Sequence, residues 1–351
     1  MTKRLLTFDL MRVIAIFIIL FHHLTDYSFN FYNLQYFGIA LDLSPWHELN
    51  PHLGLGMFLF LSGYLLNRKN INFSGFKDSK NFLSNKLLRI LPLYYLALIL
   101  FFYIDKPDSL IEIAIHTIAL QLIFVSHFPI LKTLWFVGLI MVYYLAFALV
   151  KNRTLNLLYK IAIVVILPLL ILFLGRYYGL TDVRLANYYW VFFFGTLCAE
   201  TNLFQQKIWQ KIKFVIPLSF VSIFIFMYHL EDTFGLYKIN LLQRHLLITV
   251  LSISFSLFIY QISDAVAKSI KSKKMSQAIE LVAYSSYCMF LFHRPVWYFL
   301  GKIHKEILAL DNPYVNLGIA TIIGIPLIVG ISFGLQSLHD KYFVGLFRKT
   351  A

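Results

Sequence analysis

The sequence predicts an all-α polytopic membrane protein of about ten transmembrane helices, with both termini in the cytoplasm. Composition gives the class, because 59% of the 351 residues are hydrophobic and only 14% are charged, whereas soluble chains carry about 25% charged residues. Apolar runs of roughly the length that crosses a bilayer recur from end to end. Lys and Arg gather between these runs, where they indicate cytoplasmic segments.

The same composition bears on domain organisation and partners. No stretch typical of a soluble domain exceeds roughly thirty residues, so we expect residues 1–351 to form a single integral-membrane domain without an appended soluble domain. The net charge of +14 would suit a nucleic-acid partner, but the basic residues lie in short loops as membrane topology requires. We therefore expect the chain to lie in a lipid bilayer and to bind no nucleic acid. Cys198 and Cys288 lie inside apolar runs and predict no disulfide.

Eleven apolar runs are candidate crossings, and an odd number would put the two termini on opposite sides. Basic residues contradict that arrangement, because Lys3 and Arg4 place the N-terminus inside and Lys341, Arg348 and Lys349 place the C-terminus inside. The basic loops 68–86, 151–160, 201–213 and 263–275 are also expected inside. The candidate runs are 8–28, 52–67, 87–104, 109–126, 133–150, 160–178, 186–200, 212–230, 241–262, 282–301 and 314–338.

One candidate run must therefore stay on one side of the membrane. The run 109–126 is the most polar, since it holds Glu112, His116 and Gln121, and we interpret it as an interfacial or re-entrant helix on the outer face. Ten crossings then remain, and a true eleventh crossing is the alternative. The outer loops become 29–51, 105–132, 179–185, 231–240 and 302–313.

The first crossing carries an unusual set of polar residues. At about 100° per residue, Arg12 and His23 share a helix face, Asp9 and Asp26 fall within about 60° of it, and His22 points away. Insertion of an Arg or Asp at mid-bilayer costs about 2.5–3.5 kcal/mol, and such groups usually face a bundle interior or a wet cavity. We interpret the aligned residues as a functional stripe; the alternative is that the acids sit at the interfaces and Arg12 snorkels.

The spacing along this helix limits what the stripe can do. A rise of about 1.5 Å per residue separates Arg12 from His23 by roughly 16 Å, so both cannot contact one reacting carbon. We expect Arg12 to anchor a ligand near the cytoplasmic side and His23 to act nearer the outer side. The arrangement suits an elongated ligand that runs through the bundle.

Five segments, in this order, resemble the acyltransferase-3 family of membrane proteins, and together they cover nearly the whole chain. The first has the family's first-helix pattern, in which Arg follows an Asp by three residues and His follows after ten more. The others resemble its second helix, the basic motif before its third helix, its Trp-containing fourth helix and its late Ser-Tyr…His-x-Pro segment. The segments are "FDLMRVIAIFIILFHH" (8–23), "GMFLFLSGYLL" (56–66), "KLLRILPLYYL" (86–96), "LWFVGLIMVYYL" (134–145) and "SSYCMFLFHRPVW" (285–297).

The resemblance implies ten helices with cytoplasmic termini and the transfer of acyl groups from cytoplasmic acyl-CoA to acceptors such as cell-envelope polysaccharides. It implies that Arg12 and His23, with Asp9 in the same pattern, belong to the catalytic site. Lys86 and Arg89 match a basic pair on a cytoplasmic loop that meets the donor phosphates. The family has Arg at the first position of that pair, and a Lys supplies charge without a bidentate fork. Ordinary positive-inside anchoring is the alternative for this pair.

Two departures from the family pattern bear on the acceptor. Many members carry a Glu five residues after the Trp of the fourth helix, where this chain has Ile140, so the subgroup and the acceptor stay open. We also expect no extracytoplasmic esterase-like domain of the kind that some members append. A second transfer would then need a separate extracytoplasmic partner protein.

Acyl transfer to a hydroxyl needs a base and donors for the oxyanion. His23 is the candidate base, since an imidazole titrates near neutral pH. The candidate substrate-binding residues are His293 and Arg294, which lie beside the helix-bending Pro295, and Trp135. The alternatives are that His293 is a hydrogen-bonded core histidine and that Trp135 is a tryptophan of the interfacial belt.

Other residue patterns predict no further chemistry. The histidines His116 and His127 lack the spacing of metal ligands, so no metal is expected. No phosphate-binding glycine loop appears in the sequence. We expect acyl-CoA, and more specifically acetyl-CoA, to be a co-substrate, and no cofactor to be bound permanently. Ser62 and Gly63 are interpreted as a close-packing site between helices.

Two functions fit these features. The first is a multi-pass O-acyltransferase in the cell membrane that modifies a hydroxyl of an extracytoplasmic glycan or glycolipid. The second is a polytopic transporter or exporter of such a molecule, which would also use a wet stripe through a bundle. Transporters built from repeats show two matching halves, and the absence of a clear repeat favours the enzyme.

Overall fold

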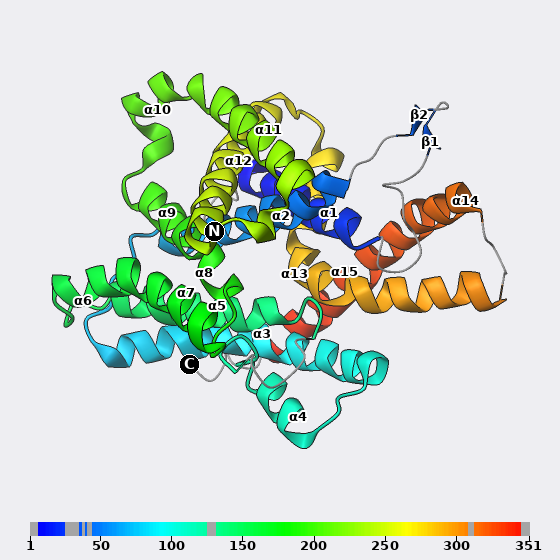
Figure 1. Ribbon diagram of the computed structural model, residues 1–351, viewed down its shortest axis with the longest axis horizontal. Coiled ribbons are helices and arrows are strands. Elements are labelled where there is room, and N and C mark those ends of the chain that lie inside the picture. The colour runs from blue at the N-terminus through cyan, green and yellow to red at the C-terminus, as the bar shows by residue number, and fades with distance from the viewer. Residues whose placement is uncertain are drawn as a thin grey trace. The chain divides into compact units, whose positions relative to one another are not determined.

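The computed structural model describes residues 6–24, 35–36, 39–40, 44–124, 131–307 and 312–344 (Figure 1). Within these ranges every element is a helix except one ladder, in which β1 (Gln35–Tyr36) pairs antiparallel with β2 (Ile39–Ala40). The all-α class is therefore confirmed for the described part of the chain.

Seven helices among the described residues are long and apolar enough to cross a membrane. They correspond to seven of the predicted crossings, and a shorter apolar helix, α5 (Trp135–Val150), corresponds to an eighth. These helices identify a multi-pass membrane protein. The seven are Leu6–Leu24, Pro45–Asn67, Phe76–Asp105, Leu157–Tyr178, Val215–Phe234, Leu241–Ser269 and Tyr314–Phe343.

The predicted crossing 282–301 lies in the long helix α13 (Lys273–Lys302), which is not among those seven. Much of α13 is covered by protein, and its buried residues include Ser285, His293 and Arg294. A helix enclosed by other helices does not need the continuous apolar surface of one that faces lipid. This enclosure explains how α13 can carry polar groups at its centre.

The chain forms two compact units. The first comprises Met1–Phe58, Val215–Ile239 and Ser254–Ala351, and the second comprises Leu59–Phe214 and Asn240–Ile253. The helices α2 (Ser44–Asn67) and α12 (Leu241–Ser269) each contribute residues to both units.

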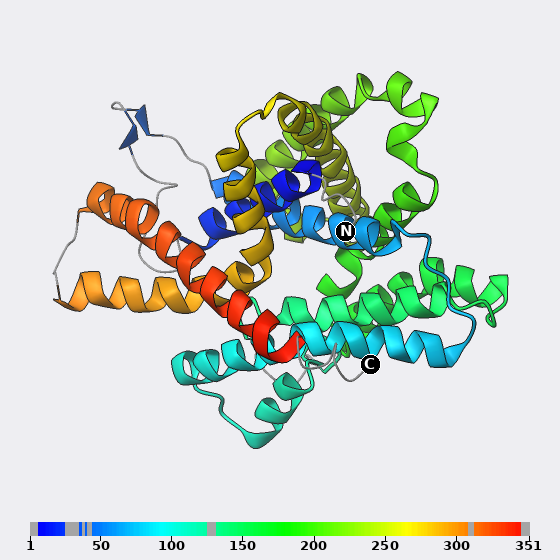
Figure 2. The same cartoon turned by 180° about the vertical axis from the view of Figure 1, so that it is seen from behind.

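In the first unit, α13 is the central helix, because both α1 (Leu6–Leu24) and α15 (Ile325–His339) pack extensively against it (Figures 1 and 2). On α1 the packed residues include Ala15 and Ile16, which are fully buried. Besides the β1–β2 ladder, the described part of this unit contains α11 (Val215–Phe234), η5 (Leu236–Lys238), η6 (Ile303–Ile307), α14 (Pro313–Gly318), η7 (Ile319–Gly324) and η8 (Asp340–Val344).

In the second unit, α5 packs against α3 (Phe76–Asp105). A π-helical stretch, η3 (Ala162–Ile166), joins α6 (Leu157–Ile161) to α7 (Leu167–Tyr178) and so completes one apolar helix of 22 residues. The other elements are α4 (Leu110–Thr117), α8 (Arg184–Asn187), α9 (Tyr189–Glu200), η4 (Leu203–Gln205) and α10 (Lys207–Ile212).

Small residues bring α2 and α9 into close contact. A Cβ at Gly63 would lie 2.0 Å from the carbonyl oxygen of Phe192, and one at Gly195 would lie 2.2 Å from that of Phe60. Both distances are far below van der Waals contact, so an alanine at either position would force the helices apart. The interpretation of Gly63 as a close-packing residue is confirmed.

The helix α3 has one packed face and one apolar exposed face. Leu93, Tyr94, Ala97, Leu98 and Phe101 are buried. On the other side large apolar side chains lie open, and an apolar surface of this kind is stable against hydrocarbon and costly in water. These exposed residues are Tyr95 (38%), Leu96 (40%), Ile99 (66%) and Tyr103 (69%).

The segment 109–126 contains only one short helix, α4, of eight residues. An eight-residue helix rises about 12 Å, too little to cross a bilayer, in agreement with the expectation that this segment does not cross as a helix. His116 Nδ1 donates to the carbonyl oxygen of Glu112 at 2.9 Å, and the N–H of Leu131 donates to His116 Nε2 at 3.2 Å. Burial lowers the pKa of His116, which keeps the ring neutral for this pair of bonds.

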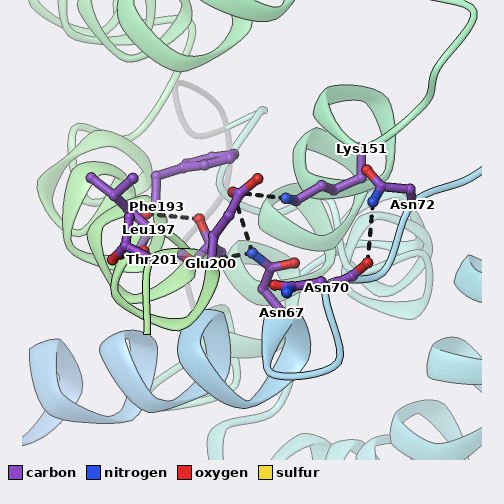
Figure 3. A network of polar contacts seen from close by, with 9 residues as sticks. Asn67, Asn70, Asn72, Lys151, Phe193, Leu197, Glu200 and Thr201 are labelled. Carbon is purple, nitrogen blue, oxygen red and sulfur yellow. Dashed lines mark hydrogen bonds and ion pairs between the residues drawn. The ribbon is translucent and has the colours of Figure 1, made fainter. Parts of the chain in front are cut away.

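Three helix C-termini meet at one end of the second unit (Figure 3). Lys151, which follows α5, contacts Glu200 at the end of α9 through Nζ and Oε2, 2.9 Å apart. Asn67, the last residue of α2, donates from Nδ2 to the carbonyl oxygen of Thr196 at 3.0 Å and to Glu200 Oε2 at 3.5 Å. The ends of α2, α5 and α9 therefore lie on the same side of this unit.

The loops that follow α2 and α5 also bond to each other. The N–H of Phe73 donates to the carbonyl oxygen of Lys151 at 3.0 Å, and the N–H of Arg153 donates to that of Phe73 at 2.9 Å. These bonds pair the loop after α2 with the loop after α5 as a short parallel bridge between Phe73 and Asn152.

Two helices begin earlier than the predicted loops allowed. The outer loop 29–51 was wrong at its end, because α2 starts at Ser44. Ser44 and Pro45 form a favourable helix start, in which the missing N–H of proline costs nothing, and the helix continues through Pro51. The loop 68–86 was likewise too long, because α3 begins at Phe76.

Candidate functional site

The polar stripe of α1 lies on the packed face of that helix. Ala15, Ile16 and Ile19 stand between Arg12 and His23 on this face at helical spacing, and all three are at most 1% exposed. The periodicity therefore predicted the inward face of α1. Asp26, the fourth member of the stripe, lies outside the described residues.

At the N-terminal end of the stripe, Asp9 and Arg12 form an ion pair. Arg12 Nη1 lies 3.0 Å from Asp9 Oδ1, and the Asp9 side chain is 2% exposed while that of Arg12 is 32% exposed. A carboxylate this deeply buried requires a charged or hydrogen-bonding partner. The pair leaves part of the guanidinium accessible, so Arg12 can still contact an anionic group.

Toward the C-terminal end of the stripe, His23 meets α13. Arg294 Nη2 lies 2.8 Å from His23 Nδ1, and the ring of His23 stacks on that of His293 with centroids 5.1 Å apart and an interplanar angle of 20°. His293 is fully buried and Arg294 is 7% exposed. Residues separated by 271 positions in the sequence thus form one polar cluster, which brings together three of the predicted site residues.

Two further histidines extend this cluster, and neither was predicted to belong to the site. The ring of His22 stacks on that of His47 with centroids 4.3 Å apart, and it also lies 4.6 Å from the ring of His23. His22 points away from the stripe as expected, but toward α2. The helix start at Ser44 places His47 on α2, so the signal that could have found it was the Ser-Pro pair.

The predicted donor-binding pair, Lys86 and Arg89, lies in the second unit on α3. The prediction that these residues lie on a loop is wrong, because no Gly or Pro interrupts 76–91 and α3 already begins at Phe76. Lys86 Nζ lies 5.6 Å from the ring centroids of Phe82 and Tyr144, while Arg89 is exposed. The pair thus offers two cations one turn apart on a helix.

Trp135 belongs to the second unit as well, at the start of α5. The guanidinium carbon of Arg184 lies 4.9 Å from its ring centroid, and Arg184 in turn pairs with Asp182 at 2.6 Å. A cation already stacks on this ring, an arrangement that anchors the chain before α9. Binding of substrate by Trp135 stays a prediction.

Other positions considered for the site have ordinary packing surroundings in the structure. Ile140, at the position of the family's Glu, is buried with 5% exposure. The Ser62 hydroxyl lies 3.0 Å from that of Tyr144, so it contacts a phenol rather than an imidazole. Among the residues that the structure describes, no group of three or more His, Cys, Asp or Glu could hold a metal ion; His127 lies outside them.

The sequence of this chain matches a known protein family. The family described as "Acyltransferase domain" matches residues 5–336, nearly the whole chain. The comparison with curated proteins gave no match, and neither did the comparison with solved structures.

Proposed function

This chain belongs to the acyltransferase-3 family, and from that membership we propose that it moves an acetyl group from cytoplasmic acetyl-CoA to a hydroxyl of an extracytoplasmic glycan or glycolipid. As a member of the family it is a membrane acyltransferase; the donor, the acyl group and the acceptor are the proposal. The cluster of His23, His293 and Arg294 is the observation that carries it.

The chemistry of this cluster supports acyl transfer. Attack of a hydroxyl on a thioester needs a group that removes the hydroxyl proton and a donor that stabilises the oxyanion. Two stacked imidazoles, of which His293 is buried and His23 half-buried, with a guanidinium bonded to His23, supply proton acceptors and donors at one place. Packing alone would be served as well by apolar side chains, which carry no cost of burial.

The basic residues support a nucleotide donor. A coenzyme A molecule carries several phosphate charges, and Lys86 and Arg89 offer cations one turn apart on α3. We assign these two residues to the donor phosphates. In the first unit, we assign the ion-paired Arg12 to an anionic ligand. Acceptor identity rests on the family resemblance alone. Ile140 stands where many members have a Glu, so the acceptor subgroup stays open, and a separate extracytoplasmic protein would complete any second transfer.

Ten crossings with both termini inside, in the cell membrane, are part of the proposal. In that topology the ends of α2, α5 and α9 all lie in the cytoplasm, and the contacts of Lys151 and Asn67 with α9 support this. An eleventh crossing at 109–126 would put the end of α2 opposite the end of α9, although Asn67 bonds to Thr196 at 3.0 Å.

Cysteine labelling in intact cells tests this topology. Both native cysteines are buried, and they are first replaced by alanine. Single cysteines then replace Lys106, Lys238, Arg153 or Lys207, all of which are exposed. We expect a membrane-impermeant maleimide to label positions 106 and 238 in intact cells, and positions 153 and 207 only after permeabilisation. Labelling of position 153 from outside would contradict the proposal and favour an eleventh crossing.

The proposed function is tested with purified protein in lipid nanodiscs and acetyl-CoA labelled in the acetyl group. We expect label to leave CoA, either to water or to an added cell-envelope glycan, in proportion to the amount of protein. The control is the double variant Lys268→Gln with Asp264→Asn, which removes an exposed ion pair. We expect it to release label at the wild-type rate. If label stays on CoA while protein in vesicles moves a glycolipid across the bilayer, the chain is a transporter.

A further inference from the structure

The partners of the His23 ring determine where its proton lies. A guanidinium carries only hydrogen-bond donors, so in the contact between Arg294 Nη2 and His23 Nδ1, 2.8 Å apart, the histidine nitrogen must accept. A neutral imidazole that accepts at one nitrogen carries its proton on the other. His23 therefore has an Nε2–H group, and its only lone pair is already used by Arg294.

The His293 ring has the opposite arrangement. Its Nδ1 lies 3.0 Å from the carbonyl oxygen of Met289, one helical turn earlier. A carbonyl oxygen only accepts, so Nδ1 donates, and the lone pair of the neutral ring lies on Nε2. This Nε2 atom is buried and has no hydrogen-bond partner among the described residues. His293 thus holds an unused proton acceptor inside the protein.

The two rings stack with centroids 5.1 Å apart and an interplanar angle of 20°, so a ring that carries an N–H donor lies next to a ring that carries an unused lone pair. These are the two functions that hydroxyl attack on a thioester requires. We propose, resting on the proposed function, that His293 is the general base of acyl transfer and that His23 stabilises the oxyanion through Nε2–H. This division reverses the expectation that His23 is the base.

The proposed transfer begins with hydroxyl attack on the thioester and ends with release of the thiol. His293 Nε2 takes the proton from the acceptor hydroxyl while the oxygen forms its bond to the thioester carbon. The charge that develops on the carbonyl oxygen is stabilised by His23 Nε2–H. The tetrahedral intermediate collapses with cleavage of the carbon–sulfur bond, and the thiolate of CoA receives the proton from His293. The products are the ester and free CoA.

Arg294 acts as a positioning residue in this scheme. Its bond to Nδ1 selects the His23 tautomer that donates from Nε2, as a second hydrogen bond commonly does for a histidine ring. Without this bond the ring could carry its proton on either nitrogen. Arg294→Lys keeps a positive charge and a donor but loses the planar fork. We therefore expect this variant to transfer the acetyl group more slowly than wild type and faster than Arg294→Leu.

Two nucleophiles and two glutamine variants separate the roles. Water needs a base to attack the thioester, whereas hydroxylamine attacks through a free lone pair. We expect His293→Gln, which has no basic nitrogen, to lower acetyl-CoA hydrolysis at least about a hundredfold and the hydroxylamine reaction far less. The amide of His23→Gln can donate in place of Nε2–H, so we expect it to retain more activity than His23→Ala with both nucleophiles. Labelled CoA binding to the nanodiscs checks that each variant is folded.

The results separate this inference from the proposed function. If wild-type protein transfers label and His293→Gln hydrolyses acetyl-CoA at the wild-type rate, the base assignment fails and the acyltransferase stands. An equal loss with water and hydroxylamine would also overturn the base assignment. If His23→Gln is no better than His23→Ala while both bind CoA, the donor role of His23 fails. If neither the wild-type protein nor any variant releases label from acetyl-CoA, the proposed function itself is overturned.

Discussion

Replacing His23 with alanine is expected to lower kcat for transfer from acetyl-CoA at least about a hundredfold, because one lost oxyanion donor typically costs that much. His23 contacts both Arg294 and His293, so its removal also leaves the guanidinium without this acceptor. An interaction made only in the transition state affects kcat and leaves KM for the donor nearly unchanged. The measurement is label release from acetyl-CoA at saturating donor.

A matched control for this prediction is His229→Ala. His229 lies on α11 and is exposed, so the same substitution there should leave kcat at the wild-type value. A His23→Ala protein that binds CoA and turns over as fast as wild type would remove His23 from the mechanism.

Replacing both Lys86 and Arg89 with alanine is expected to raise KM for acetyl-CoA at least about tenfold, with a much smaller change in kcat. A charge-assisted hydrogen bond contributes about 1.5–3 kcal/mol, and about 1.4 kcal/mol corresponds to a tenfold change in affinity. Arg89 is exposed, so salt screens its share and the effect should shrink as ionic strength rises. The measurement is the dependence of initial rate on donor concentration at two salt concentrations.

The same helix offers a control with the same loss of charge. Lys77 and Lys80 are exposed on the first turns of α3, and the double alanine variant there should keep the wild-type KM. Lys86→Arg restores the family's residue and its bidentate fork, so its KM should be no higher than that of wild type. Equal KM values for both double variants would show that Lys86 and Arg89 have no special part in donor binding.

The face of α1 was predictable because helical periodicity is a local property. Arg12 and His23 lie eleven residues apart, and helix geometry alone placed them on one side, with Ala15 and Ile16 buried between them. Apolar run lengths likewise predicted most of the long helices. The resemblance supplied the order of the motifs, and the match over residues 5–336 bears it out.

The contact that defines the site could not be predicted in the same way. His23 and Arg294 meet through tertiary packing across 271 positions, and no local pattern reports which helix lies opposite α1. The proton positions on His23 and His293 follow from those partners, so the sequence could not predict them either. The early start of α2, which brings His47 to His22, was missed because the predicted crossing 52–67 followed the apolar run alone, and the first turns of α2 are more polar than that run.

The most direct test of the site is a density map of the protein in a nanodisc with an acetyl-CoA analogue whose thioester sulfur is replaced by a methylene. We expect the acyl carbonyl oxygen within about 3 Å of His23 Nε2, with His293 beside the carbonyl carbon and Arg294 still bonded to His23 Nδ1. A carbonyl bound elsewhere, or His23 and Arg294 turned toward the lipid, would contradict the assignment of this cluster as the acyl-transfer site.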